Sequence, residues 1–381
     1  MLTAEQQYVL SLLRHALVLG GCANDAESVE TFTVLNYVQR NGILLTVYPA
    51  LTADSPAKQI LQNEYLANIA QHVNQEYEGK RVIKALCEAG LRCVPLKGWD
   101  IRELYPHSTM RQMTDVDLLV EEFDFNRVCD VMTSLGFRAI DGDESYYKHD
   151  VFCKGSVTFE IHKRIMDETG PVNQWEAGVW GRLVCSDDGW HMSAEDRYVL
   201  HFVHMGHDFK NGWFGLRRIV DVWLLEQGED ELDKEYVNRM LASMGLLEFR
   251  DRMVALAQVV MGEKEPSDDD ELLLDYAFGT GIYGNGVSHK AARVAMMSKG
   301  GVLLGSLRSK VAAVFLPYGR MKAQFPVLER WPVLLPVCWV RRIVRFLGSK
   351  NLQTYRSMLD YSNVSKEDVE NMRKVQHAGG F

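Results

Sequence analysis

The sequence predicts an α+β fold in which a mixed β-sheet core lies between a helical N-terminal region and a helical C-terminal domain. Helical periodicity covers most of residues 1–88, short strand-like runs fill residues 89–190, and helical periodicity returns over residues 191–381. The length of 381 residues also argues for more than one unit, since a single core stops growing at about 250–300 residues. We therefore divide the chain into these three parts.

Helices are predicted at both ends of the chain. Apolar residues recur at spacings of three and four after Val9, and residues 63–85 are rich in Glu, Gln, Lys and Ala, as in amphipathic helices. Asn41-Gly42 and Ser55-Pro56 mark turns between three or four N-terminal helices. The last six residues are expected to fray. Later helices are predicted over residues 194–208, 214–226 and 236–261.

The central part predicts a mixed sheet. Short apolar runs alternate with turns at glycines, in the order strand, helix, strand, helix and then three strands. Strands are predicted at residues 91–96, 115–120, 137–140, 146–152 and 157–162, and helices at residues 99–105 and 123–135.

Charge is distributed unevenly along the chain. The net charge of −9 argues against a dedicated duplex-DNA binder, which usually presents a basic face. Residues 306–350 nevertheless hold nine basic residues and one acid, a net charge of +8, which leaves −17 for the remainder. This basic segment faces something anionic or the acidic remainder of the chain. A packed helical element with a solvated basic edge is the preferred interpretation. A peripheral membrane contact is the alternative, because Trp331 and Trp339 flank apolar residues just before Arg341, Arg342 and Arg345.

The cysteines and the hydrophobic runs limit the class of protein further. The seven cysteines are odd in number and scattered, and no CxxC pair occurs, so neither a zinc knuckle nor a disulfide framework is indicated. Free thiols without a secretory signal indicate a reducing, cytoplasmic location. Residues 331–340 are the most hydrophobic late stretch and include two prolines, whereas a spanning helix needs about 20 residues. No transmembrane segment is predicted.

Two aspartates on one predicted strand are the first sign of chemistry. Asp115 and Asp117 are two residues apart, so their side chains share a face, about 7 Å apart along the strand. Two carboxylates on one face repel each other unless a cation lies between them. A merely solvated strand would explain the pair less well, because Leu118-Leu119-Val120 make the strand core-like and unpaired acids in a core are costly.

A third carboxylate follows on a later strand. Within residues 157–162, Thr158, Glu160 and His162 share one face. If this strand neighbours the aspartate strand, three carboxylates converge as a hard-oxygen site suited to Mg²⁺. Two Mg²⁺ ions are expected, with Mn²⁺ as an alternative, because such ions neutralise the oxygens of a phosphate undergoing in-line displacement.

The order of these motifs resembles a known family. The runs Leu96-Lys97-Gly98, Leu104-Tyr105-Pro106, residues 111–120 (RQMTDVDLLV) and Glu160-Ile161-His162 are similar to an uncharacterised nucleotidyltransferase family of the polymerase-β-like superfamily. That superfamily has a strand ending in a glycine motif, a helix, an Asp-x-Asp strand and a later strand with one carboxylate. The likeness extends more loosely through residues 200–225 and 325–342. One departure is that Lys97-Gly98 stands where Gly-Ser or Gly-Gly is usual.

The resemblance implies a nucleotidyltransferase-type core and a role for each matching residue. Asp115 and Asp117 would bind both Mg²⁺ ions, and Glu160 would complete the site of the catalytic ion and help to deprotonate the acceptor. Gly98 would let the backbone approach a triphosphate at the start of a helix, where free N–H groups favour anions. Lys97 would add a point charge to a phosphate.

Four other residues have two interpretations each. Arg111 either clamps a phosphate or holds the aspartates through an ion pair. Lys163 is either a phosphate ligand or an ordinary basic residue at a strand end. His162 is expected to orient Glu160 or to touch the acceptor, rather than to serve only structure. Asp221, beside Arg217 and Arg218, is expected to form a structural ion pair or a contact that orients its helix.

A histidine-rich helix provides a further candidate site. Positions 201, 204 and 208 share a helical face, but no glutamate follows His201 as in the zinc-protease motif. We therefore favour a role in lining a cleft, in contact with nucleotide or acceptor, or internal hydrogen bonds, over a zinc site. The residues concerned are His201, His204, His207 and Asp208.

The predicted reaction is transfer of a nucleoside monophosphate from a nucleoside triphosphate to an acceptor hydroxyl, with release of pyrophosphate. The acceptor is a small molecule, a glycan, a protein or an RNA end; the absence of a broad basic surface disfavours long nucleic acid. One alternative is a non-catalytic nucleotide-binding or scaffolding protein of the same fold, suggested by Lys97-Gly98. The other is a membrane-peripheral partner in a glycan or peptide modification pathway.

Overall fold

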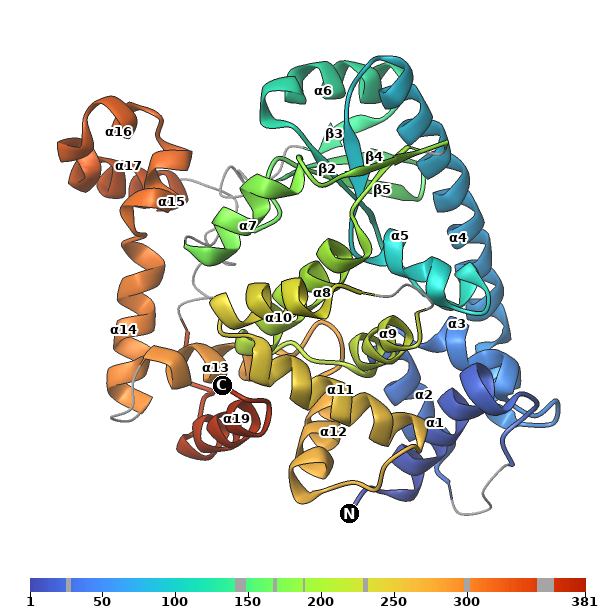
Figure 1. Cartoon of the computed structure of the whole chain (residues 1–381). Coiled ribbons are helices and arrows are strands. Elements are labelled where there is room, and N and C mark those ends of the chain that lie inside the picture. The colour runs from blue at the N-terminus through green and yellow to red at the C-terminus, as the bar shows by residue number, and fades with distance from the viewer. Residues whose placement is uncertain are drawn as a thin grey trace.

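A mixed sheet at one end of the molecule and a layer of helices at the other make up the body of the protein (Figure 1). The structure, a computed structural model, describes residues 1–24, 29–140, 149–166, 170–187, 189–228, 232–297, 302–347 and 360–381. The predicted α+β class with helical regions on both sides of the sheet segment is confirmed.

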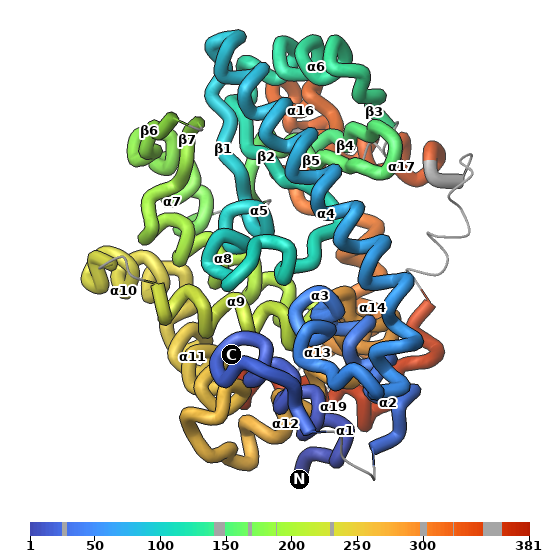
Figure 2. The backbone as a smooth tube through the Cα atoms, turned by 90° about the vertical axis from the view of Figure 1, so that its right-hand side faces the viewer, coloured from blue at the N-terminus to red at the C-terminus, as the bar shows by residue number. Residues whose placement is uncertain are grey.

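The central sheet has five strands. They are β1 (Cys93–Pro95), β2 (Val116–Val120), β3 (Arg138–Ile140), β4 (His149–Lys154) and β5 (Val157–His162). Their order is β1-β2-β5-β4-β3, with β2 and β5 parallel and the other pairs antiparallel. The tube in Figure 2 shows β1, β2, β5 and β4 side by side. Since parallel neighbours need a long connection, the chain returns from β2 to β5 through helix α6 (Phe125–Ser134) and strands β3 and β4.

One face of the sheet is apolar and covered. Val116 and Leu118 of β2 pack with Phe159 and Ile161 of β5 beneath helices α4 (Pro56–Glu88) and α6. Strand side chains alternate between faces, so the intervening residues of β2 and β5 must point the other way. The sheet therefore presents its polar residues on the face opposite α4 and α6.

Helix α4 belongs to both ends of the molecule. It is 33 residues long, which corresponds to about 50 Å at 1.5 Å per residue. Ala57 and Leu61 near its start lie in the core of the helical layer, whereas Val82 and Leu86 near its end lie in the core under the sheet. Figure 1 shows α4 running along one side of the body from the sheet to the helical layer.

The helical layer combines the two ends of the chain around one core. Leu12 and Leu13 of α1 are fully buried with Leu256 of α11 in one apolar cluster, and the Arg14 Nε donates to the Val260 carbonyl at 2.8 Å. Residues from 1–88 and 191–381 thus share this core. The helices are α1 (Ala4–Arg14), α2 (Thr31–Arg40), α3 (Leu44–Val47), α8 (Ala194–Lys210), α9 (Leu216–Glu226), α10 (Lys234–Ser243), α11 (Leu247–Met261), α12 (Asp268–Thr280) and α19 (Lys366–Ala378).

Smaller elements connect the sheet to the helices. A short helix follows β1, and a helix and a two-stranded hairpin follow β5. These are α5 (Gly98–Ile101), α7 (Pro171–Val179), β6 (Val184–Ser186) and β7 (Gly189–His191).

A separate group of helices, residues 302–347, stands to one side of the body, and we call it the C-terminal lobe (Figure 1). Helix α13 (Gly286–Met297) leads into it from the body. The lobe has a small apolar core of its own around Met321, Phe325, Leu328 and Cys338. Within the described ranges, every helix is too short or too polar to span a bilayer. The lobe consists of α14 (Val302–Val314), α15 (Tyr318–Gln324), α16 (Val327–Arg330) and α17 (Leu335–Leu347).

Three predicted elements have different limits in the structure. The helix predicted over residues 236–261 is two helices, α10 and α11, because Gly245 between them has φ +67°, which ends a helix. The helix predicted over residues 99–105 is α5 followed by one 3₁₀ turn. The strand predicted from residue 146 is observed from His149 on, and residues 146–148 lie outside the described part of the chain.

The prediction that the last residues fray is wrong. The Phe381 ring stacks on Phe249 at 4.9 Å between centroids, and the Lys210 ammonium lies 4.1 Å from the centre of the Phe381 ring. A large aromatic residue at the end of the chain therefore packs against the body.

A buried ion pair joins the sheet segment to the helical layer. Arg111, in the loop before β2, donates from Nε to Asp221 Oδ1 at 2.9 Å and from Nη2 to Oδ2 at 2.7 Å. Tyr105 donates a third hydrogen bond to Asp221 at 2.8 Å. Asp221 lies on α9, so this network fixes the loop that leads into the aspartate strand against the helices. The prediction of a structural ion pair for Asp221 is confirmed.

Replacing Arg111 by methionine should destabilise the protein strongly. Arg111→Met leaves the Asp221 carboxylate buried without its charged partner, so the free energy of unfolding should fall by about 3–5 kcal/mol, measured by urea denaturation. The exposed Lys80–Glu76 pair provides the control, because Lys80→Met should cost less than about 1 kcal/mol. Equal small losses in both variants would contradict a structural role for the buried pair.

Candidate active site

Strand pairing brings the predicted acidic residues together. In the parallel register of β2 and β5, Asp117 lies directly opposite Glu160, on the face that α4 and α6 leave uncovered. Asp115 precedes β2 and follows the loop that Arg111 fixes. Directly paired strand residues share a face at about 5 Å. The predicted convergence of the Asp-x-Asp strand with the glutamate strand is therefore observed.

Lys97 and His162 both contact the carboxylate of Asp117. The Lys97 Nζ lies 2.6 Å from Asp117 Oδ1, and the His162 Nε2 lies 2.7 Å from the same oxygen. Burial alone would raise the pKa of Asp117, but Lys97 and His162 hold it well below its usual range. Asp117 therefore stays ionised at a position that is only 5% exposed.

Asp115 has the opposite electrostatic environment. Burial, followed by the charges of Asp117 and Glu160, raises the pKa of Asp115 to about 6. In contrast, the His162 hydrogen bond lowers the pKa of Glu160 despite its burial. Of the three carboxylates, Asp115 is thus the one whose charged form is disfavoured, first by burial and then by repulsion, and a bound cation would relieve the repulsion.

Lys97 itself has an unusual backbone. Among the described residues it is the one non-glycine residue with positive φ, at φ 52° and ψ −117°. Such a conformation costs of order 1–3 kcal/mol and persists where the surroundings enforce it, often at functional sites. Here the ion pair with Asp117 holds the side chain. Lys97-Gly98, which departs from the superfamily's usual Gly-Ser or Gly-Gly, thus places the Lys97 ammonium against Asp117.

Gly98 is crowded rather than open on its side-chain side. A Cβ at Gly98 would lie 2.3 Å from the Arg111 Nη1 and 2.9 Å from the Met113 sulfur. Any larger residue would therefore push against the arginine that holds the loop before Asp115. This packing explains a glycine here without a phosphate, and a backbone contact to phosphate stays a prediction.

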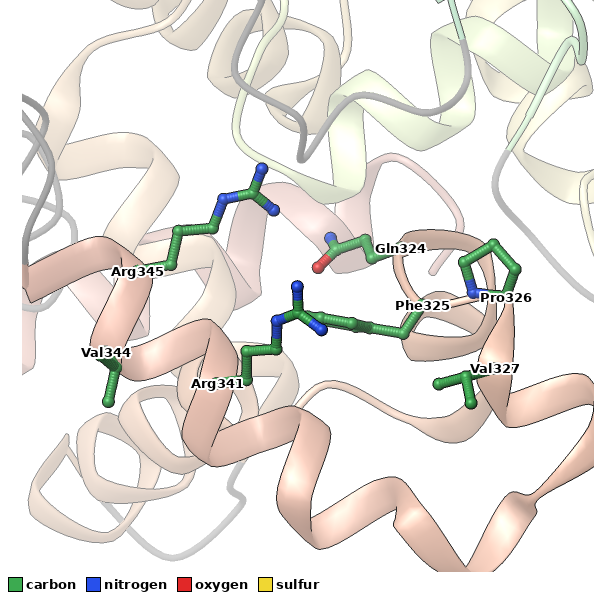
Figure 3. A pocket seen from close by; sticks show the side chains of 7 residues that line it. All are labelled: Gln324, Phe325, Pro326, Val327, Arg341, Val344 and Arg345. Atoms are coloured by element: carbon green, nitrogen blue, oxygen red, sulfur yellow. The ribbon is translucent and has the colours of Figure 1, made fainter.

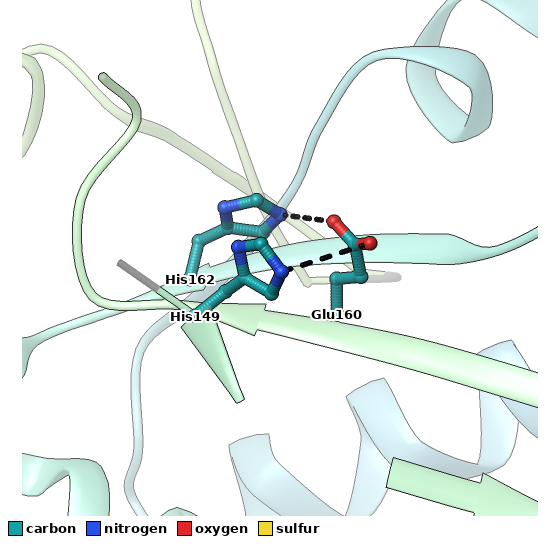
Figure 4. Close-up of side chains that lie close together, drawn as sticks. All are labelled: His149, Glu160 and His162. Atoms are coloured by element: carbon teal, nitrogen blue, oxygen red, sulfur yellow. Dashed lines mark ion pairs between the residues drawn. The ribbon is translucent and has the colours of Figure 1, made fainter. Parts of the chain in front are cut away.

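The structure adds His149, which the sequence interpretation missed. His149 on β4 pairs directly with His162 on β5, and its Nε2 lies 3.8 Å from Glu160 Oε1. The His162 Nε2 is 3.3 Å from the other Glu160 oxygen. Figure 4 shows both rings directed at this carboxylate. Donor atoms of all three residues lie within 4.8 Å of one another, so they form a group able to hold a metal ion.

Two overlapping sets of ligands therefore share Glu160. Asp115, Asp117 and Glu160 offer carboxylate oxygens, which Mg²⁺ prefers. His149, Glu160 and His162 add two imidazoles, which suit softer ions such as Mn²⁺ or Zn²⁺. Burial first, and then repulsion from Asp117 and Glu160, raises the pKa of Asp115, and a divalent cation beside the three carboxylates would relieve that repulsion.

A small cavity beside Lys97 extends the site toward the helical layer. It lies between α5 and α8–α9, and its lining includes Lys97, Arg197 and Arg218, each between 20% and 24% exposed. His201 and His204 line it as well, while Arg218 pairs with Asp208 at 2.6 Å. His201 and His204 therefore line a cavity of only about 10 Å³, and a contact of this helix with nucleotide or acceptor stays a prediction.

Two predicted nucleotide-binding residues point elsewhere. Arg111 is only 4% exposed and holds Asp221 rather than the aspartates of β2. Lys163 donates to Asp150 at 2.9 Å, and its ammonium lies 4.2 Å from the centre of the Phe125 ring. Strand alternation turns Lys163 away from Glu160 and His162. The structure thus groups Lys97 and His162, but not these two residues, with the carboxylates.

Tyr283 is a further residue at the site that the sequence did not reveal. It is 63% exposed, and its hydroxyl lies 3.4 Å from the Thr114 hydroxyl, next to Asp115. The loop between α12 and α13 carries it there from a position 169 residues away along the chain. An exposed aromatic ring beside the carboxylates has the chemistry to stack on a base.

Comparison with known proteins agrees with this geometry. The family described as uncharacterised nucleotidyltransferase matches residues 27–262. The chain belongs to this family. The match includes the whole sheet and the carboxylate cluster but ends before the C-terminal lobe, so it does not reach the looser likeness over residues 325–342. No curated protein and no solved structure matches the chain significantly.

Replacing Asp115 by a neutral residue should stabilise the protein. Asp115 is neutral in the folded protein below pH 6 but ionised above about pH 4 when unfolded, so the folded state binds more protons in this window. Stability is therefore lost as pH rises from about 4 to 6, and the full penalty remains above that range. Asp115→Asn should raise the free energy of unfolding at pH 7.5 by about 2 kcal/mol.

The pH dependence of this gain provides the check. Urea denaturation of wild type and Asp115→Asn should show the difference shrinking as pH falls toward 4. Glu122→Asn, an exposed acid at the end of β2, is the control and should show no such trend. A gain that does not change with pH would mean that Asp115 is not under charge repulsion.

Proposed function

We propose that the protein transfers a nucleoside monophosphate from a nucleoside triphosphate to an acceptor hydroxyl, with Mg²⁺ and release of pyrophosphate. The observation that carries this proposal is the register that sets Asp117 opposite Glu160, with Asp115 adjoining. Three carboxylates on one face, inside a nucleotidyltransferase family match, are the ligands that this reaction requires.

Asp115, Asp117 and Glu160 would hold the metal. Mg²⁺ bound there would neutralise phosphate oxygens and stabilise the attacking and leaving oxygens. Asp117 is already ionised at neutral pH because Lys97 and His162 stabilise its charge. Asp115, whose pKa is raised to about 6, is also largely ionised at neutral pH and is able to bind a cation. Catalysis then consists mainly of positioning and charge neutralisation.

Glu160 is suited to receive the acceptor hydroxyl. Its pKa is lowered by His162, so its carboxylate is ionised at neutral pH and accepts a hydrogen bond from the hydroxyl. The same carboxylate would take the proton as the oxygen attacks the α-phosphorus. His162 fixes the glutamate through the 3.3 Å contact and thereby acts as a positioning residue.

Lys97 is suited to a phosphate of the triphosphate. Its ammonium contacts Asp117 and lies beside a cavity of about 10 Å³, so the phosphate chain would bind at the edge of this cavity, where the positive charge would hold it in line for transfer. All seven cysteines are free thiols in the structure, and a reducing, cytoplasmic location is proposed on this ground. The acceptor is proposed to be a small molecule, a glycan or a protein.

Label transfer tests this function. Full-length protein is incubated with each α-³²P-labelled nucleoside triphosphate, Mg²⁺ and a panel of hydroxyl acceptors. Asp117→Asn and Glu160→Gln should each lower transfer at least about a hundredfold, because each removes a charge that the transition state needs. Glu122→Gln should leave it unchanged. An inert wild type that still binds nucleotide would support the non-catalytic, nucleotide-binding alternative that Lys97-Gly98 suggests.

His149 should set the preference between metals. His149→Ala removes one imidazole from the set that shares Glu160 but keeps all three carboxylates. Activity supported by Mn²⁺ should therefore fall several-fold more than activity supported by Mg²⁺. Parallel titrations of both metals measure this, with His107→Ala as a control outside the group. Equal losses with both metals would show that His149 does not act through metal binding.

A further inference from the structure

The C-terminal lobe combines exposed apolar side chains with basic ones in an unusual way. On α17, Val337, Val340 and Val344 are 60–62% exposed. Their spacing of three and four residues places them on one side of the helix. Arg341 and Arg345 are exposed on that same side. A helix of this kind, with apolar and cationic residues side by side, is typical of helices that lie in a bilayer interface.

The opposite side of α17 shows that this exposure is built into the lobe. Cys338 is buried, the Arg342 Nη1 donates to the carbonyls of Ala313 and Val314 at 3.2 and 3.1 Å, and the Trp339 Nε1 donates to the Leu316 carbonyl at 2.9 Å. These bonds hold α17 on the end of α14. The orientation that exposes the three valines is therefore fixed by polar bonds and by the lobe's own core.

Other parts of the lobe repeat the pattern. On α14, Leu303, Leu307 and Val311 are 88%, 58% and 49% exposed and follow one another at spacings of four. Trp331 and Val333, between α16 and α17, are 55% and 76% exposed. Soluble proteins rarely leave so many large apolar groups uncovered in one region unless the region binds something.

The charge of the lobe indicates what it binds. Within the described residues 302–347 there are eight basic side chains and one acid, Glu329, which pairs with Lys322 at 3.1 Å. The remainder of the chain is acidic overall. An anionic partner is therefore expected at the lobe alone. Nucleic acid would match the charge, but exposed valine and leucine side chains make no hydrogen bonds to phosphates, which receive half or more of the hydrogen bonds in protein–DNA complexes. A bilayer accepts both kinds of side chain.

A pocket on the lobe suits an anionic headgroup. It lies between α15–α16 and α17, and its volume of 640 Å³ is in the range of small-ligand sites. Figure 3 shows the guanidinium groups of Arg341 and Arg345 extending toward Gln324 and Phe325, and none of its lining residues is acidic. Arg341 also lies over the Phe325 ring, 5.9 Å from its centre.

We propose that the C-terminal lobe docks this nucleotidyltransferase on anionic bilayers. The valines of α17 and the leucines of α14 enter the interface between headgroups and acyl chains, while the arginines bind lipid phosphates. The lobe lies outside the family match over residues 27–262, and the proposal depends on neither the reaction nor the metal. It reverses the preference for a solvated basic edge, because many apolar residues of this segment are exposed outside its small core.

Vesicle co-sedimentation of the full-length protein tests the proposal. Wild type should sediment with vesicles of equal parts phosphatidylcholine and phosphatidylglycerol, less with phosphatidylcholine alone, and less at high salt. The triple variant V337D/V340D/V344D and the double variant R341Q/R345Q should each lower the partition coefficient about tenfold or more, since each basic residue near an anionic surface contributes about 1 kcal/mol.

Matched variants on α4 control for general effects of charge. Ile60, Leu66 and Val73 are 53–57% exposed, so I60D/L66D/V73D makes the same change on the body, and K80Q/K84Q matches the loss of two charges. Neither should change vesicle binding. Circular dichroism and label transfer in solution should be the same for the lobe variants and wild type, which separates a docking defect from misfolding.

A spectroscopic measurement locates the contact. Brominated acyl chains quench tryptophan that enters the bilayer interface, and the quenching should be lost in Trp331→Phe. Wild type that fails to sediment with any vesicle, or a triple variant that binds as well as wild type, overturns the proposal. Dimerisation in ultracentrifugation that V337D/V340D/V344D abolishes, without vesicle binding, would assign the surface to a second copy and likewise overturn it.

Discussion

The repulsion among three carboxylates on one face of a sheet is the constraint on which the site depends. Parallel pairing of β2 with β5 forces Asp117 and Glu160 to be neighbours, and the fold can satisfy this only by supplying positive charge. Lys97 does so with its ammonium, and the His162 Nε2 forms a hydrogen bond with the same oxygen of Asp117. Asp115 receives less compensation and holds its proton up to a higher pH. Burial and the two neighbouring carboxylates together disfavour the charged form of Asp115, and a cation at this place would relieve the repulsion.

The helical layer holds parts of the site in place. Arg111 and Asp221 fix the loop before Asp115, and Arg218 and Lys97 reach one cavity from opposite sides. Loops held by buried ion pairs lose little entropy when a ligand binds, so the site is preorganised. The strained φ of Lys97 fits the same interpretation, because a residue in a glycine conformation stays there only when its side chain is held.

The acidic part of the site could be predicted from sequence because it depends on a local rule. Alternation along a strand placed Asp115 with Asp117 and Glu160 with His162, and the family resemblance indicated that the strands adjoin. His149 could not be found in this way, since its position depends on the register of β4, which no local pattern specifies. Tyr283 and the partner of Arg111 were missed for the same reason, as both contacts join residues more than a hundred positions apart.

Helices and strands could be predicted from the sequence where apolar residues recur with a clear period. Which of their side chains are buried could not, because that depends on the elements that pack against them. Both helical regions and all five strands of the main sheet follow from the pattern of apolar residues. Spacing in the C-terminal lobe indicates helices equally well, but it does not reveal whether another element covers them. In the structure Val337, Val340 and Val344 remain exposed. Similarly, Phe381 packs against Phe249 although chain ends usually fray.

The length of α4 has a consequence for motion. Helix α4 is part of both cores, so bending it would break apolar contacts at one end or the other. It thus connects the two cores rigidly. The sheet and the helical layer therefore cannot open about a free hinge. Any opening of the site must use shorter segments, such as the loop that carries Tyr283. Thermal unfolding should correspondingly involve both cores in one cooperative transition.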